Sequence, residues 1–179
     1  MSKIKYKGGC AVMLKLPEHD QVELDSLRVQ ARQSEERSDW RILPPETYHL
    51  TLQFVGRDLS SEKISRVVFS TFLFAEDEAP FQIEFTGVTS VNRTSKGSYL
   101  VAQVIKSNNI LRMRERILDK FAQMDVKVKD GFGFNPHVTI AEADPGRAWP
   151  GELPTSKSFS VDCNELVLKY GARRMSIDL

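Results

Sequence analysis

The sequence predicts an α+β fold: two pseudo-symmetric lobes of antiparallel β-sheet, with helices outside, around a central cleft. Helical segments are separated by pairs of strand-like segments, and strands joined by short turns pair antiparallel. The pattern His-x-Thr-aliphatic occurs at 49–52 and again at 137–140, so we expect one lobe in each half of the chain. The 179 residues, 41% of them apolar, suffice for the core of one domain spanning 1–179.

The first half of the chain predicts two strands and two helices. An apolar run over 10–16 indicates a buried strand that ends at Pro17, and leucines at helical spacing indicate a helix over 20–32. A polar loop over 34–45 leads to a strand over 49–55, which we expect to stop at Gly56. Ser60 or Ser61 then caps a second helix. Its predicted inward face consists of Ile64, Val67, Val68, Thr71 and Phe72.

The second half predicts a hairpin, a helix and several closing strands. Alternation over 81–85 and an apolar run over 98–105, joined by the turn-rich segment 92–97, indicate the hairpin. Asn108 or Asn109 is the expected cap of the third helix. Further strands are expected over 137–141, 158–161, 166–168 and 175–179, with a Pro/Gly-rich loop over 144–157.

Composition excludes several classes of protein. The formal net charge of +1 excludes a polybasic protein that binds nucleic acid through bulk electrostatics. Cys10 and Cys163 form neither a disulfide framework nor a zinc-ligand spacing. No apolar run approaches the length of a membrane span or of a signal-peptide core. We therefore expect a cytoplasmic monomer with no protein partner.

The repeated pattern places chemical groups on one face of each strand. Side chains alternate along a strand, so His49 and Thr51 share one face while Leu50 and Leu52 share the other. The same alternation relates His137 and Thr139. If an approximate two-fold axis relates the lobes, both faces meet across one cleft. Two of the three histidines in the chain lie in these patterns, which argues against a purely structural role.

Two imidazoles and two hydroxyls form a set suited to phosphodiester chemistry. The unperturbed pKa of histidine is about 6.5, so one ring can accept a proton from water while the other protonates the leaving oxygen. Each such transfer typically contributes ~10²- to 10⁴-fold in rate. The threonine hydroxyls can bind the non-bridging phosphate oxygens. This chemistry requires no metal and no cofactor.

The two motifs, HLTL at 49–52 and HVTI at 137–140, resemble the signature pair of the 2H phosphoesterase superfamily, which includes RNA 2′,3′-cyclic phosphodiesterases, also called 2′–5′ RNA ligases. The surrounding segments WRILPPETYHLTLQFVG (40–56) and FGFNPHVTIAE (132–142) are similar to the family in order and spacing. Segments 111–124 and 165–171 look most like the short phage and bacterial forms.

The resemblance implies a bilobal fold and metal-independent catalysis through His49 and His137. Thr51 and Thr139 would bind phosphate. It further implies that His137 is the general base and His49 the acid, and that hydrolysis of a cyclic phosphate leaves a 2′-phosphate end. All four motif positions are intact in this sequence.

Several further residues are candidates for substrate binding. Trp40 in the polar loop, and Phe132 and Phe134 before the second motif, could stack on a base, although core packing is the alternative for the phenylalanines. Arg173, with Lys169 and Arg174, could contact phosphate, with surface solvation as the alternative. His19 is expected to be solvated.

Several functions remain open at this point. The leading hypothesis is a phosphodiesterase for an RNA end with a 2′,3′-cyclic phosphate, or for a 2′–5′-linked or cyclic nucleotide. Degradation of a cyclic nucleotide immune signal is a variant of this activity. A non-catalytic module that binds RNA ends would use the same cleft without turnover. A metal hydrolase is disfavoured because the sequence has no HExxH and no clustered cysteines and histidines.

Overall fold

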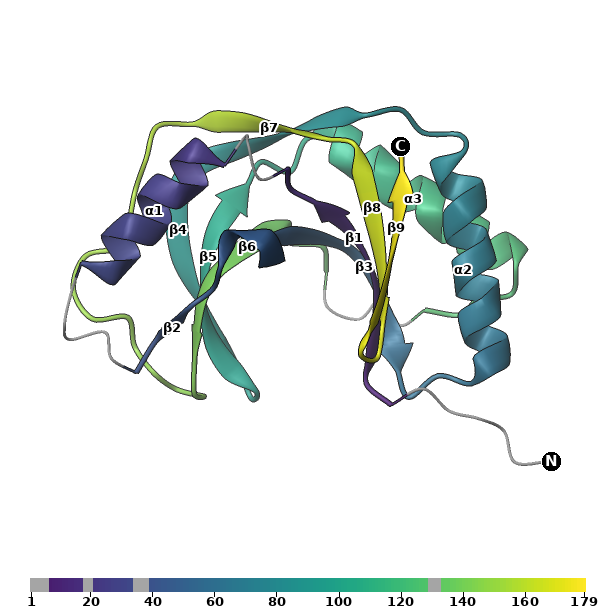
Figure 1. The fold of residues 1–179 in the computed structure, drawn as a ribbon, viewed down its shortest axis with the longest axis horizontal. Coiled ribbons are helices and arrows are strands. Elements are labelled where there is room, and N and C mark those ends of the chain that lie inside the picture. Colours follow the sequence, from purple (N-terminus) through teal and green to yellow (C-terminus); the bar gives the residue numbers. More distant parts are fainter. Residues whose placement is uncertain (1–6, 18–20, 34–38, 129–132) are drawn as a thin grey trace.

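The computed structural model describes residues 7–17, 21–33, 39–128 and 133–179, which form three α-helices around a nine-stranded sheet (Figure 1). Expectations for His19 and Phe132 lie outside the described residues. The elements in chain order are β1 (Gly9–Lys15), α1 (Val22–Arg32), β2 (Arg41–Ile42), the 3₁₀-helix η3 (Pro45–Thr47), β3 (His49–Arg57), α2 (Ser61–Ala75), β4 (Phe81–Thr94), β5 (Gly97–Val104), α3 (Asn108–Gln123), β6 (His137–Ala143), β7 (Phe159–Cys163), β8 (Glu165–Tyr170) and β9 (Arg173–Asp178).

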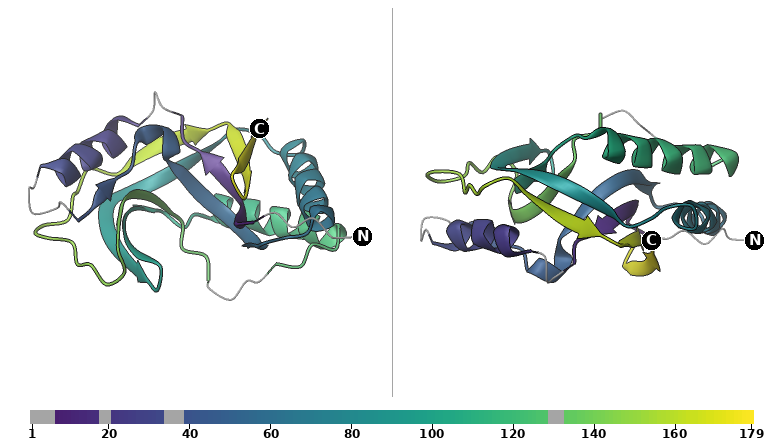
Figure 2. Two further views of the ribbon diagram at one scale, coloured as in Figure 1. Left: turned by 60° about the horizontal axis from the view of Figure 1, so that its bottom comes forward. Right: turned by 90° about the horizontal axis from the view of Figure 1, so that it is seen from above.

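The sheet has two halves that meet at the two motif strands. Its strand order is β7-β4-β5-β6-β3-β1-β8-β9, with β2 paired to β6, and all pairs are antiparallel. We call β7-β4-β5-β6 the β6 half and β3-β1-β8-β9 the β3 half. Figure 1 shows α1 beside the β6 half and α2 and α3 beside the β3 half, and Figure 2 shows α1 and α3 on opposite sides of the sheet. The predicted α+β class with antiparallel sheet is confirmed.

The expectation of one lobe in each half of the chain is wrong. The β3 half combines β1 and β3 from the start of the chain with β8 and β9 from its end. Strand periodicity indicates that β8 exists but not that it pairs with β1, because pairing depends on contacts distant in sequence. Strands from the first and last parts of the chain therefore lie side by side in one half of the sheet.

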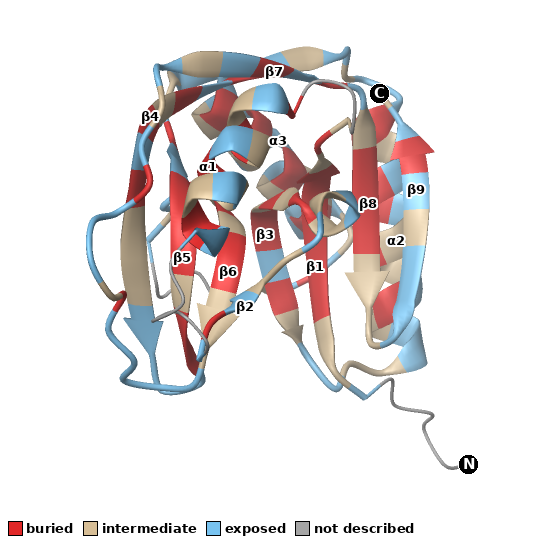
Figure 3. Cartoon of the chain, turned by 60° about the vertical axis from the view of Figure 1, so that its left-hand side comes forward, coloured by how far each residue is buried: buried red, intermediate tan, exposed pale blue. Residues whose placement is uncertain are grey.

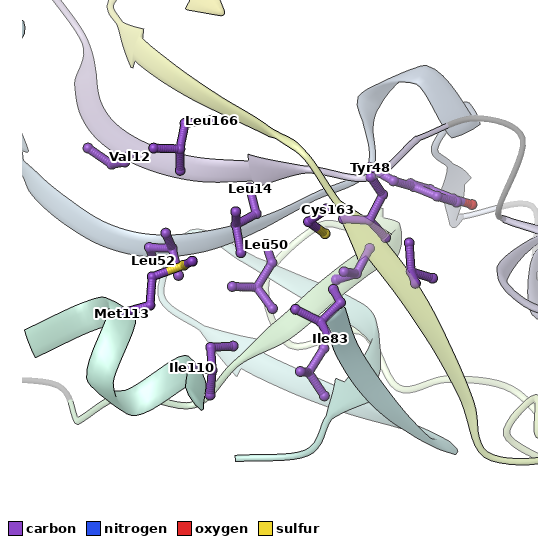
Figure 4. Close-up of a cluster of buried hydrophobic side chains, with 14 of the residues drawn as sticks. Val12, Leu14, Tyr48, Leu50, Leu52, Ile83, Ile110, Met113, Cys163 and Leu166 are labelled. Atoms are coloured by element: carbon purple, nitrogen blue, oxygen red, sulfur yellow. The ribbon is translucent and has the colours of Figure 1, made fainter. Parts of the chain in front are cut away.

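The buried core lies between the sheet and its helices. Leu50, Leu52, Val138 and Ile140, the apolar members of the two motifs, are fully buried. Figure 4 shows Leu52 beside Met113 of α3. In Figure 3 the buried residues concentrate on the central strands. Burial of these aliphatic side chains on one face directs the neighbouring histidines and threonines to the opposite face.

Several elements differ from the prediction in detail. The strand that starts at His49 continues through Gly56 to Arg57. In α2, Phe72 is 41% exposed and Phe74 is buried instead. Because α2 packs against α3 as well as against β8 and β9, its buried face includes Phe74 and Ala75, which a single-sided pattern does not anticipate. Part of the predicted loop over 34–45 forms β2 and the start of η3.

The described α-helices lack the uninterrupted apolar length that a membrane-crossing helix requires.

The helix caps follow serines. Ser60, the first of the two expected residues, caps α2 by accepting a hydrogen bond from the Lys63 backbone N–H. The expectation of Asn108 or Asn109 as the cap of α3 is wrong. Ser107 is the cap and accepts from the Ile110 backbone N–H, so both asparagines lie inside the first turn.

Replacement of Ser107 by alanine is therefore expected to lower the free energy of unfolding by about 1 kcal/mol, because one helix N–H loses its acceptor. Asn109→Ala, which is exposed in the same turn, is the matched control and should not destabilise the protein. Chemical denaturation of both variants measures the difference. Equal destabilisation by Asn109→Ala would contradict the cap assignment.

Candidate active site

The two histidines begin the two strands at which the halves of the sheet meet. A single residue pair, Leu50 with Val138, joins β3 to β6. Continuing this antiparallel register by one residue on each side places His49 opposite Thr139 and Thr51 opposite His137. All four side chains are half-buried, whereas Leu50 and Val138 are fully buried. The expected alternation of faces is confirmed in both strands, and the four polar side chains surround one point of the sheet.

The two imidazole rings are held in the same way. Nδ1 of His49 lies 2.7 Å from the carbonyl oxygen of Thr47, and Nδ1 of His137 lies 2.7 Å from that of Asn135. A carbonyl oxygen only accepts hydrogen bonds, so Nδ1 carries the proton in each ring. In both rings Nε2 is therefore the nitrogen that can accept or release a proton.

Both motif strands bulge at the same position. In the pairing of β1 with β3, Met13 faces Thr51 and Val12 faces Gln53, so Leu52 has no partner. In the pairing of β5 with β6, Ile140 is skipped in the same way. A bulge increases the local twist of a strand. The two bulges follow the His-x-Thr segments and help β3 and β6 to diverge after their single contact.

Burial lowers the pKa of His49 below its usual value of 6.5. The hydrogen bond to the Thr47 carbonyl opposes this effect, while positive charge on Lys169, Arg174 and His137 lowers the pKa further. The neutral form of His49 is therefore favoured. The contribution from His137 also means that the two rings lie within reach of each other's electrostatic field.

Two cavities of different character flank the motifs. The cavity beside His49 is about 230 Å³, and its lining combines the polar side chains of Lys15, Thr47, Arg174 and Ser176 with the apolar Met13 and Val167. The cavity beside His137 and Thr51 is about 700 Å³ and follows the edge of β3 that β6 leaves unpaired. Its lining combines aromatic and basic side chains: Phe54, Arg57, Lys63, Arg114, Lys127 and Phe134.

The prediction of Trp40 as a stacking residue at the cleft rim is wrong. Trp40 is only 6% exposed, packs edge-on against Trp149 at 4.9 Å, and donates from Nε1 to the carbonyl of Ala148 at 3.3 Å. Polar neighbours in the sequence suggested an exposed loop, but the ring is covered by a segment more than a hundred positions away.

Phe134 lies where a substrate-contacting residue would be expected. It lines the larger cavity beside His137, and the Arg114 guanidinium lies 5.0 Å from its ring centre. Phe134 also packs against the core. Its surroundings therefore fit both stacking on a base and core packing, the two alternatives that the sequence left open.

Arg173 does not lie beside the motifs. It pairs with Tyr170 next to the β8–β9 turn, on the face of β9 opposite to Arg174. Arg174, one residue further, lines the His49 cavity. The register of β9, which the sequence does not reveal, decides which of the two arginines faces the cavity.

Sequence reasoning missed several residues near the motifs. Lys15 pairs with His49 across β1 and β3, Gln53 is buried at the bulge, and Phe54 is 45% exposed in the larger cavity. A lysine at the end of an apolar strand is a weak indication of a functional residue. The position of Lys15 beside His49 follows only from the strand pairing. Within the described residues, no three His, Cys, Asp or Glu side chains group as metal ligands.

Solved structures with similar folds cover almost the whole chain. The protein TT0787 of Thermus thermophilus is 20% identical, with a TM-score of 0.68 over 94% of this chain and 97% of its own. Escherichia coli LigT, crystallised with 3′-AMP, is 16% identical, with a TM-score of 0.62 over 98% and 96%. Usb1 of Kluyveromyces marxianus is 15% identical, with a TM-score of 0.59 over 97% and 99%. These similarities concern the fold.

Comparison of the sequence with curated proteins gives no match. A family model described as the 2′-5′ RNA ligase superfamily matches residues 16–168, a range that includes both His-x-Thr motifs. The resemblance inferred from those motifs is confirmed, and the protein belongs to the 2′-5′ RNA ligase superfamily, the 2H phosphoesterases.

Proposed function

We propose that the protein is a metal-independent phosphodiesterase that hydrolyses a nucleotide phosphodiester, with a 2′,3′-cyclic phosphate at an RNA end as the preferred substrate. Membership in the superfamily supports a phosphodiesterase-type enzyme. The observation that carries the proposal is the matched pair of imidazoles, each anchored through Nδ1 at 2.7 Å, on strands that meet at one residue pair. In this proposal the phosphate binds between the rings, where both Nε2 atoms act on it.

In this mechanism one ring removes a proton from water and the other protonates the leaving oxygen. Water adds to phosphorus, the bond to the 3′ oxygen breaks, and a 2′-phosphate with a free 3′ hydroxyl results. Because its pKa is lowered, His49 is the neutral ring and acts as base, and His137 acts as acid. This reverses the roles implied by the resemblance. Thr51 and Thr139 donate hydrogen bonds to the non-bridging oxygens.

The larger cavity supports a nucleotide substrate. Its exposed Phe54 and its partly buried Phe134 offer aromatic surface to a base, and its basic residues offer charge to a phosphate backbone. The structure of LigT with 3′-AMP shows that a protein of this fold binds a nucleotide. A panel of cyclic-phosphate RNA, 2′–5′ oligoadenylate and cyclic dinucleotides would rank the substrates. Preference for a cyclic dinucleotide would favour degradation of a signalling nucleotide.

Replacement of either histidine by alanine should lower kcat/KM for 2′,3′-cyclic AMP by at least ~10²-fold, because one proton transfer is lost. The assay includes excess EDTA, which should leave wild-type activity unchanged. Asn109→Ala serves as the active control, and circular dichroism confirms folding. Undiminished turnover in either histidine variant would contradict the mechanism. Tight binding by the wild type without turnover would favour a binding module. Loss of activity in EDTA would favour a metal hydrolase.

Removal of a threonine hydroxyl should also slow the reaction. Thr51→Val and Thr139→Val keep the side-chain shape and should each lower kcat by about 10²-fold, since a donor to the developing phosphate charge is lost. Thr51→Ser and Thr139→Ser retain the hydroxyl and should recover most of the rate. If serine and valine variants behave alike, the hydroxyls do not bind the transition state.

The dependence of kcat/KM on pH tests which ring is the base. The base must be unprotonated, so activity should fall on the acid side with an apparent pKa below the usual histidine value of 6.5. A fall centred at or above 6.5 would contradict the assignment of His49 as base. Steady-state rates between pH 4.5 and 8.5 at constant ionic strength give the profile.

A further inference from the structure

Two cations face each other on the β3 half of the sheet. Lys169 of β8 pairs directly with Arg174 of β9. Lys169 also pairs with Ala11 of β1, whose face of the sheet is shared by Lys15, the cross-strand partner of His49. Lys169 and Arg174 therefore lie on the same face as His49. Like charges directly opposite each other destabilise a sheet, so an anion bound beside this pair would relieve the repulsion between them.

The described acidic side chains do not neutralise this pair. Lys15, which lines the same cavity as Arg174, has its own partner, since its Nζ lies 3.1 Å from Glu165. Within the described part of the chain, neither Lys169 nor Arg174 takes part in an ion pair. Glu46 is exposed at the edge of the His49 cavity and is the one carboxylate in its lining.

The small volume of the cavity and the cationic side chains in its lining also fit an anion. Its volume of about 230 Å³ lies below the roughly 300–1,000 Å³ of most pockets for organic ligands. Ser176 and Thr47 add polar groups to the cationic side chains in its lining. The corresponding cross-strand neighbour of His137 in the other half of the sheet is the neutral Gln103. The cross-strand neighbours of the two histidines therefore differ in charge, because Lys15 is cationic and Gln103 is neutral.

We propose that Lys169 and Arg174 form an anion subsite beside His49 that binds a second, uncleaved phosphate of the substrate. The inference rests on the proposed function and deepens it. The substrate is then a nucleotide whose 5′ oxygen carries a phosphate: a free 5′-phosphorylated mononucleotide, or the last residue of a strand through its internucleotide phosphate. Charge-assisted hydrogen bonds from two cations would hold that group.

The test compares adenosine 2′,3′-cyclic phosphate, its 5′-phosphorylated form, and the dinucleotide ApA with a terminal cyclic phosphate. The measured quantity is the ratio of kcat/KM with and without the 5′-linked phosphate. Hydrogen bonds to charged groups contribute about 1.5–3 kcal/mol, so the ratio should be at least ~10 in the wild type. Arg174→Gln and Lys169→Gln should each bring the ratio close to one. Preference for the mononucleotide or for ApA identifies the source of the phosphate.

Arg173→Gln is the matched control, because it removes the same charge from the opposite face of β9 and should keep the ratio. If Arg173→Gln lowers the ratio as much as Arg174→Gln does, the effect is one of overall charge and the subsite is refuted. A wild-type ratio near one, with turnover of the unphosphorylated compound, refutes the subsite and leaves the proposed phosphodiesterase intact.

Binding of the reaction product separates the subsite from catalysis. Calorimetric titration should give adenosine 2′,5′-bisphosphate an affinity at least ~10-fold higher than adenosine 2′-phosphate, and Arg174→Gln should abolish this difference. The same preference in a protein without turnover would support the subsite and contradict the proposed function. Equal affinities in the wild type would overturn the subsite.

Discussion

The pairing of Leu50 with Val138 is the contact on which the rest of the arrangement depends. It is the one residue pair that joins β3 to β6 within the described chain, and its two side chains are completely buried. Their burial directs His49, Thr51, His137 and Thr139 to the other face. A bulge follows in each strand, and β3 and β6 form no further residue pair in the described chain. A contact of one pair thus brings four polar groups together while leaving space on either side of them.

The two halves of the sheet are similar in geometry but have different cavities beside their histidines. Each presents a histidine held by a carbonyl two residues before it, a threonine and a bulge. The cavity beside His49 is small and includes Lys15 and Arg174 in its lining, whereas the cavity beside His137 is larger and is lined by aromatic and basic side chains. The two histidine–threonine pairs are therefore equivalent in geometry but lie in unequal surroundings.

The sequence was sufficient to predict the two motifs and which of their side chains share a face of the strand, because alternation along a strand is a local property. Contacts between segments that are distant along the chain could not be predicted from the sequence. Trp40 is buried by Trp149, and β8 completes the sheet beside β1. The choice between Arg173 and Arg174 depends on the register of the last strand. The cap of α3 is Ser107, one residue before the predicted asparagines, and the sequence could not distinguish them because all of these adjacent residues have side chains suited to capping.

The anchoring of both rings by main-chain oxygens has a consequence for how this protein tolerates mutation. The acceptors belong to Thr47 and Asn135, but their side chains take no part in those two bonds. A point substitution cannot delete a peptide carbonyl. The orientation of the imidazoles is therefore independent of which side chain occupies either position. Only changes that move the backbone itself, such as an insertion or deletion between these residues and the histidines, would release the rings.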